Sequence, residues 1–133
     1  MKVAEIMHTD LKTVSTDATV ADAVAALAGE GISALPVLDR NGRAVGVCST
    51  RDVLVAESRC ADAAARERLF ERTLVLEIMT PWPRTAHPEE NVRAVAQRML
   101  DGHVHRLFVE DRGTLVGVIS QTDIVAAVAA TRV

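Results

Sequence analysis

The chain has 133 residues, of which 49% are hydrophobic and 25% charged, and its formal net charge at pH 7 is −3. This size and composition predict one compact domain, or one domain made of two halves, and the absence of a basic cluster argues against nucleic-acid binding. No apolar run reaches the roughly 18 residues that a membrane-spanning helix needs, so we expect no membrane association.

An internal repeat organises the sequence. The segment Val3–Met7 returns as Val75–Met79, 72 residues later, with Glu, Ile and Met in the same places. The segment Gly46–Asp52 returns as Gly117–Asp123, 71 residues later, so the two copies differ by a gap of one residue. We therefore predict a first repeat at 1–57, a linker at 58–74 and a second repeat at 75–133, which together form one module.

Each repeat is predicted to start with one helical turn and a short extended piece. The extended piece lies around Thr13-Val14 in the first repeat and around Arg84-Thr85 in the second. Prolines at positions 81, 83 and 88 disfavour a helix there.

A capped helix follows in each repeat. In the first, Thr19–Asp22 has the spacing of a capping box, and Gly29 or Gly31 ends the helix. In the second, Asn91 is the N-cap and Gly102 ends the helix.

Two strands and a closing helix complete each repeat. In the first repeat they are predicted at Ile32–Leu38, Val45–Cys48 and Asp52–Glu57. In the second repeat they are predicted at Val104–Glu110, Leu115–Ile119 and Asp123–Ala130. The second strand of each pair is apolar enough to be buried on both faces, and turn residues separate it from the first.

The residues between the repeats, Ser58–Thr73, read as a polar helix rich in Ala, Arg and Glu, with an apolar edge at Leu69 and Phe70. We interpret it as a linker helix packed on the outside of the core. A partner-binding helix is the alternative.

The predicted fold is α+β. Neither repeat of about 50 residues buries enough apolar surface to be stable alone. Two repeats packed sheet against sheet about a pseudo-two-fold axis, with the helices outside, would share one core. That arrangement leaves two equivalent clefts, the kind of place where small ligands bind.

These features resemble the CBS domain, and two of them in tandem resemble a Bateman module. The resemblance covers nearly the whole chain except the linker. Its residues are Gly46, Ser49 and Asp52, then Gly117, Ser120 and Asp123, with Ile78–Pro81, Ala34–Val37 and Val104–Leu107 in support.

The resemblance implies a regulatory module rather than an enzyme. CBS pairs bind adenosine derivatives such as AMP, ADP, ATP, S-adenosylmethionine or NAD, and they commonly form homodimers, discs of four repeats. With nothing fused to it, this chain resembles the stand-alone form, which acts on an unknown regulated protein. The competing hypothesis is a ligand-free scaffold that acts only in dimerisation or partner binding.

The resemblance assigns the ribose hydroxyls to Asp123 and Asp52, because a carboxylate accepts two donors at once. Phosphate binding is expected where the closing helices begin, since free N–H groups and the helix dipole favour an anion there. The residues concerned are Ser120, Thr122, Ser49 and Arg51. Ser-x-x-Asp at a helix start is also an ordinary capping arrangement that needs no ligand.

His105 and Arg106 match a His-Arg pair of the family whose side chains reach phosphates. The alternative is that Arg106 pairs with an acid such as Glu110. Ser33 and Ala34 hold the corresponding positions of the first repeat, so we expect unequal sites. Whether Arg106 serves its own repeat or the other one stays open.

Three further candidates, Thr13, Val14 and Thr85, fall on the extended pieces that in the family contact the base, largely through backbone. We predict no metal site and no resident cofactor; Mg²⁺ would enter only with a di- or triphosphate. A cluster of His87, His103 and His105 is the metal-binding alternative.

Cys48 is interpreted as a small core residue rather than a nucleophile. Cys48 and Cys60 are too few for a disulfide framework, and no signal-peptide core is visible, so we expect a reduced, cytoplasmic setting. The richness in Ala and Arg is typical of a GC-rich bacterial genome. Trp82 is predicted to pack either at a dimer interface or on its own module.

Overall fold

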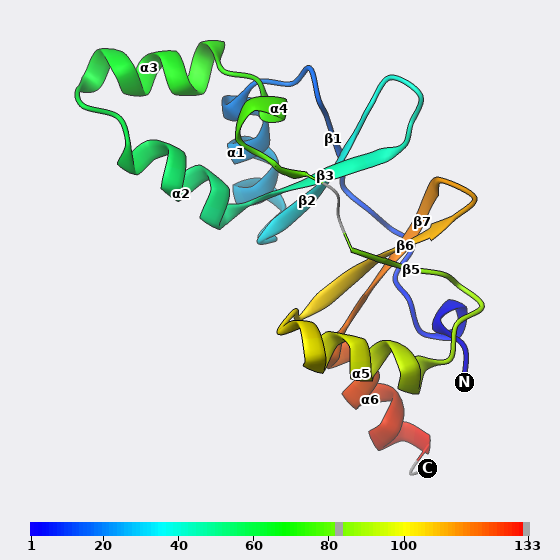
Figure 1. The fold of residues 1–133 in the computed structure, drawn as a ribbon. Helices are drawn as coiled ribbons and strands as arrows, with labels where there is room; N and C mark the ends of the chain where they lie inside the picture. The colour runs from blue at the N-terminus through cyan, green and yellow to red at the C-terminus, as the bar shows by residue number, and fades with distance from the viewer. Residues whose placement is uncertain (82–83, 132–133) are drawn as a thin grey trace. The chain divides into compact units, whose positions relative to one another are not determined.

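The computed structural model describes residues 1–81 and 84–131, so the predictions made for Trp82 and Pro83 lie outside the described residues. The α+β fold expected from the sequence is confirmed, with two small mixed sheets and helices beside them (Figure 1). In chain order the elements are η1 (Val3–Glu5), β1 (Val14–Ser15), α1 (Val20–Glu30), β2 (Ala34–Leu38), β3 (Ala44–Ser49), α2 (Thr50–Ser58), α3 (Ala63–Arg72), α4 (Val75–Ile78), β4 (Thr80–Pro81), β5 (Thr85–Ala86), α5 (Val92–Gly102), β6 (Arg106–Asp111), β7 (Thr114–Ser120) and α6 (Gln121–Thr131).

The chain forms two compact units. The central unit is continuous, Lys12–Pro83, whereas the terminal unit combines Met1–Leu11 with Arg84–Val133. The units therefore do not follow the repeats along the sequence. Each opening segment, by which we mean Val3–His8 and Val75–Thr80, packs with the strands of the other repeat.

The central unit contains a sheet in the order β1-β2-β3-β4. β1 runs parallel to β2, and the other pairs are antiparallel. β4 belongs to the second opening segment and pairs Thr80 with Val47 of β3. The linker also packs here, because α3 contacts α1 and α2 and buries Leu69.

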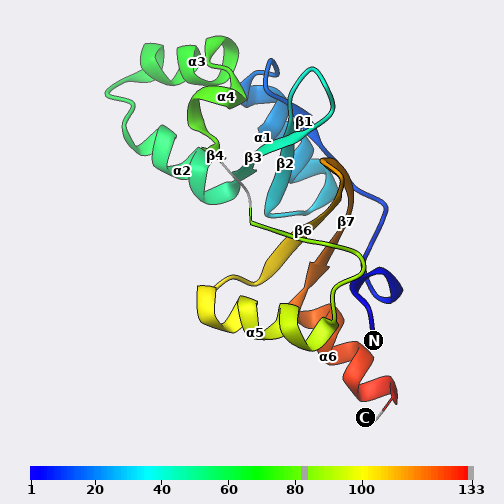
Figure 2. The ribbon, with the colours of Figure 1, turned by 45° about the vertical axis from the view of Figure 1, so that its right-hand side comes forward.

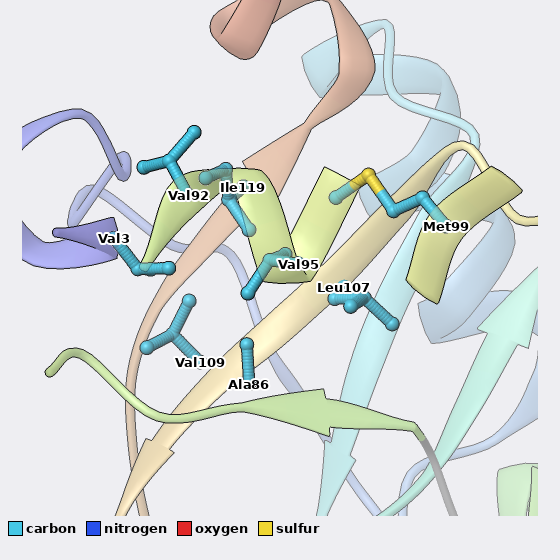
Figure 3. Packing of buried hydrophobic residues seen from close by; sticks show 8 residues of the cluster. All are labelled: Val3, Ala86, Val92, Val95, Met99, Leu107, Val109 and Ile119. Carbon is cyan, nitrogen blue, oxygen red and sulfur yellow. The ribbon is translucent and has the colours of Figure 1, made fainter. Parts of the chain in front are cut away.

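The terminal unit contains a sheet in the order β5-β6-β7, with β5 parallel to β6 and β6 antiparallel to β7. Apolar residues from η1, α5 and all three strands form its core (Figure 3). The first opening segment adds a bridge from His8 to Val118, which mirrors the pairing of Thr80 with Val47. This segment lies beside the strands in both Figure 1 and Figure 2.

Glycine makes this close approach possible in both units. A Cβ built on Gly46 would lie 2.6 Å from the sulfur of Met79 and 2.8 Å from the carbonyl oxygen of Thr80. A Cβ built on Gly117 would lie 2.8 Å from both the Met7 sulfur and the His8 carbonyl oxygen. The repeated glycine is therefore the place where an opening segment crosses a strand.

The helix starts were predicted correctly from local chemistry. The hydroxyl of Thr19 accepts from the N–H of Asp22, and the side chain of Asn91 accepts from the N–H of Arg93. Gly31 ends α1 in the left-handed conformation, with φ of 64°.

The end of α5 was predicted one residue early. Gly102 remains helical, and His103 takes the left-handed conformation with φ of 53°. Histidine is among the residues that tolerate this region, and the His103 N–H bonds the carbonyls of Met99 and Leu100.

The single linker helix expected at Ser58–Thr73 was wrong in its extent. α2 runs through Ser58, the N–H groups of Arg59 and Cys60 close its last turn, and Asp62 caps a new helix, α3. Asp62 is a good N-cap, so a second helix starts where the prediction had one continuous helix.

The prediction that the second strands are buried on both faces was wrong, because one face of each is only half-buried. Gly46 and Cys48 of β3 are buried while Val45 and Val47 are half-buried, and β7 has the same alternation. The alternation follows from the period of two in a strand, which an all-apolar sequence conceals.

Candidate functional site

Each closing helix begins at a capping box. In the central unit, the N–H of Ser49 donates to Asp52 Oδ2 at 2.9 Å, and the N–H of Asp52 donates to Ser49 Oγ at 3.1 Å. In the terminal unit, Ser120 and Asp123 make the same two bonds at 2.8 and 3.1 Å. The capping interpretation of both Ser-x-x-Asp motifs is therefore confirmed, and it uses one oxygen of each carboxylate.

The second oxygen of each carboxylate accepts a donor from an opening segment. Asp52 Oδ1 lies 3.0 Å from the hydroxyl of Thr80. Asp123 Oδ1 lies 2.6 Å from Nε2 of His8. Thr80 and His8 are equivalent, since each directly follows the repeated methionine.

Sequence reasoning missed His8 and Thr80. The sequence does show that they follow Met7 and Met79, and it shows the repeated glycines, Gly117 and Gly46, that they cross. What the sequence did not indicate was that each opening segment packs on the other repeat, because that choice is made by the path of the whole chain.

The environment of Asp123 favours its charged form. Burial raises the pKa of this carboxyl, but hydrogen bonds from Ser120 and His8 more than offset it, so the pKa lies below its usual value. The Asp123 side chain is 15% exposed and the His8 side chain 67% exposed. Asp123 is thus an ionised acceptor at the surface of the unit, with a solvent-accessible partner.

The first turns of the two closing helices differ at the residue before the aspartate. It is Arg51 in the central unit and Thr122 in the terminal unit, and both are exposed. A phosphate at the start of α2 would meet a guanidinium, whereas one at the start of α6 would meet a hydroxyl.

The His105-Arg106 pair lies beside the Ser120 junction of its own unit. Arg106 is the register partner of Ser120 across β6 and β7. The carbonyl of His105 accepts from the N–H of Gln121 at 2.9 Å. The imidazole Nδ1 of His105 lies 3.4 Å from Gln121 Oε1. Gln121 is a further residue beside this junction that sequence reasoning missed.

The central unit has the same backbone arrangement without those side chains. The carbonyl of Ser33 accepts from the N–H of Thr50 at 3.0 Å, and Ala34 pairs with Ser49. The two junctions therefore share a frame but differ in the charge that surrounds it.

The candidates for base contacts lie at or beside the first strands. Thr13 is exposed next to β1, and Val14 is buried in the core, which leaves only its backbone for a ligand. The carbonyl of Thr85 in β5 accepts from Arg98 at 2.9 Å. One strand separates β1 from β3 and β5 from β7.

The surroundings of Cys48 and of the candidate metal-binding histidines suit structural roles. Burial, with a smaller effect of Asp52, raises the pKa of the Cys48 thiol to about 11, as suits a core residue. Within residues 1–81 and 84–131, no three His, Cys, Asp or Glu side chains are grouped to hold a metal. Nε2 of His87 instead lies 3.3 Å from Oδ1 of Asp111. The described helices include none that is long and apolar enough to cross a bilayer.

Comparison with known proteins gives one family. The model described as "CBS domain" matches residues 3–59 and 75–130. The chain is 32% identical over 123 residues to the 5'-AMP-activated protein kinase subunit gamma-3 of Sus scrofa, covering 89% of this chain and 23% of that subunit. It thus spans less than a quarter of that relative.

Solved structures match over nearly the whole chain. CBSX2 of Arabidopsis thaliana in complex with AMP has a TM-score of 0.84 and 27% identity, covering 99% of this chain and 98% of that one. The CBS domain pair of protein MJ0100, in complex with 5'-methylthioadenosine and S-adenosyl-L-methionine, has a TM-score of 0.78 and 25% identity, covering 96% and 98%.

Proposed function

Because the chain belongs to the CBS domain family, with one copy of the domain at residues 3–59 and another at 75–130, we propose that it is a regulatory sensor of an adenosine-containing ligand. The ligand class is that of AMP, ADP, ATP, S-adenosylmethionine or NAD. Two relatives of similar fold carry AMP or S-adenosyl-L-methionine with 5'-methylthioadenosine, which supports this class.

The observation that carries the proposal is the state of the two carboxylates. One oxygen of Asp52 and one of Asp123 serve the helix cap, and the other accepts a side-chain donor. A ribose offers hydroxyl donors of the same kind. Each aspartate can therefore keep its cap and accept a ribose hydroxyl in place of the present partner.

The other roles follow from position. Ser49 and Arg51, or Ser120 and Thr122, would hold a phosphate at the start of a closing helix. His105 and Arg106 would add charge beside Ser120. Base contacts are assigned to Thr13, Val14 and Thr85.

In this proposal the module regulates and does not catalyse. A ligand would shift the balance between two packings of the repeats or of two protomers in a homodimer, which requires unequal affinity for the two states. Mg²⁺ would accompany only a di- or triphosphate. Both cysteines are free thiols, which supports a cytoplasmic setting.

A ligand-free scaffold is the second candidate. An apolar hollow of about 460 Å³ lies between α1 and α2, and Leu54 at its rim is 63% exposed. Exposed apolar surface of this kind suits association with another protein.

Thermal unfolding against AMP, ADP, ATP, S-adenosylmethionine and NAD separates the two. A ligand at 100 times its dissociation constant should stabilise the protein by about 2.7 kcal/mol. No shift with any of them would favour the scaffold.

Variants then test the site. Asp52→Ala and Asp123→Ala should each remove binding at one site. Asp22→Ala is the matched control, because Asp22 holds the same capping-box position in α1 without a partner from an opening segment. Unchanged affinity in both site variants would overturn the ribose assignment.

A further inference from the structure

The two carboxylates of the proposed sites are held by different kinds of donor. Asp123 accepts from the imidazole of His8, and Asp52 accepts from the hydroxyl of Thr80. The two donors occupy equivalent positions, and both cross the glycine of the second strand. An imidazole gains a proton in the physiological range, whereas a hydroxyl does not.

The elements around His8 differ in the ionisable groups that they carry. β7, which it bridges at Val118, has no ionisable residue, and Asp123 is the only one in α6. β6 brings Arg106 opposite Ser120, and His105 lies just before that strand. The opening segment and the residues beside it contribute Lys2, Glu5 and Asp10, of which Lys2 bonds Glu89.

We propose that His8 and Thr80 are the residues with which a ribose competes for the carboxylates, so that His8 adds a pH dependence to binding at the Asp123 site and Thr80 adds none at the Asp52 site. This inference rests on the proposed function. It assigns a specificity role to two residues outside the Ser-x-x-Asp motifs.

The direction of the effect follows from the competition. A protonated His8 makes a charge-assisted bond to Asp123, which is stronger than the bond from a neutral imidazole. A ribose must break it, so nucleotide binding releases a proton and affinity falls as the pH falls. Asp123 itself stays ionised over this range, since its bonds hold its pKa below the usual value.

AMP is the probe, measured by calorimetry between pH 8 and 5.5. Asp52→Asn isolates the Asp123 site, because an amide oxygen can still accept the cap bond. AMP affinity is compared in this protein with and without His8→Thr, which copies the residue present at position 80. The ratio of the two affinities cancels the titration of the AMP phosphate, which falls in the same range.

The variant lacking His8 should bind AMP about tenfold more tightly at pH 5.5, and this advantage should shrink as the pH rises toward 8. Thr80→His in an Asp123→Asn background should create the same pH dependence at the Asp52 site. This reciprocal variant guards against a local folding defect in His8→Thr.

A ratio that is constant with pH in both backgrounds would overturn the inference and leave the proposed function standing. A ratio of opposite sign, with His8 tightening binding at low pH, would also overturn it, because His8 would then contact the phosphate. Absence of AMP binding in every protein would overturn it together with the AMP-sensing function.

Discussion

The two strand-to-helix junctions share a backbone but not a chemistry. Both have a capping serine, an aspartate that serves the cap with one oxygen, and a glycine under an opening segment. The side chains around the two junctions differ. The central unit offers Arg51 and Thr80, and the terminal unit offers His8 and Arg106. The two copies of the junction thus share the acceptor and differ in the charge around it.

Substitution of the two glycines has the largest expected effect on the shared part. Gly46→Ala and Gly117→Ala would each place a methyl group within 2.8 Å of a backbone oxygen. Each should lower the free energy of unfolding by about 1–3 kcal/mol, as overpacking does, in urea titrations.

Gly29→Ala is the control, since a Cβ there meets nothing within 4 Å and alanine favours a helix. If Gly46→Ala and Gly117→Ala were as stable as this control, the close crossing of the opening segments would be wrong.

Exchange of the residue before the aspartate tests the diverged part. With the Asp123 site disabled, Arg51→Thr should weaken AMP binding about tenfold, because a charge-assisted phosphate contact is lost. Adenosine, which has no phosphate, should bind equally to both proteins. A loss that is equal for AMP and adenosine would show that Arg51 acts on the fold and not on the phosphate.

The acid sensitivity of Asp123 should give the smallest effect. Its pKa is lowered in the folded state, so its stabilisation is present above the unfolded value near 3.9 and is lost as the pH falls through the folded pKa. Asp123→Asn should therefore cost about 1 kcal/mol at pH 6 and progressively less as the medium becomes acid. Urea unfolding across an acid pH series measures this, and a cost independent of pH would contradict it.

Local chemistry made much of the fold predictable. Thr19, Asp22 and Asn91 cap helices because their side chains reach N–H groups within the next turn, which needs no distant partner. The repeated Ser-x-x-Asp motif located both junctions for the same reason.

The packing of each opening segment on the strands of the other repeat was not predictable in this way. Gly46 and Gly117 both leave room for a crossing segment, so the pattern of residues permits either pairing. The bond from His8 to Asp123 joins residues 115 positions apart. Such contacts depend on how the whole chain is routed, which periodicity and capping signals do not encode.

This packing of the opening segments also sets the order in which the two units can fold during biosynthesis. The central unit is continuous, so it can fold as soon as its last residue has left the ribosome. The terminal unit needs Met1–Leu11, made before the central unit, and β7 and α6, made after it. Until α6 has been made, Val3, which is fully buried in the folded protein, has no core to enter. Nascent chains halted after the central unit should therefore be cleaved by protease within residues 1–11, while chains that include α6 are protected there.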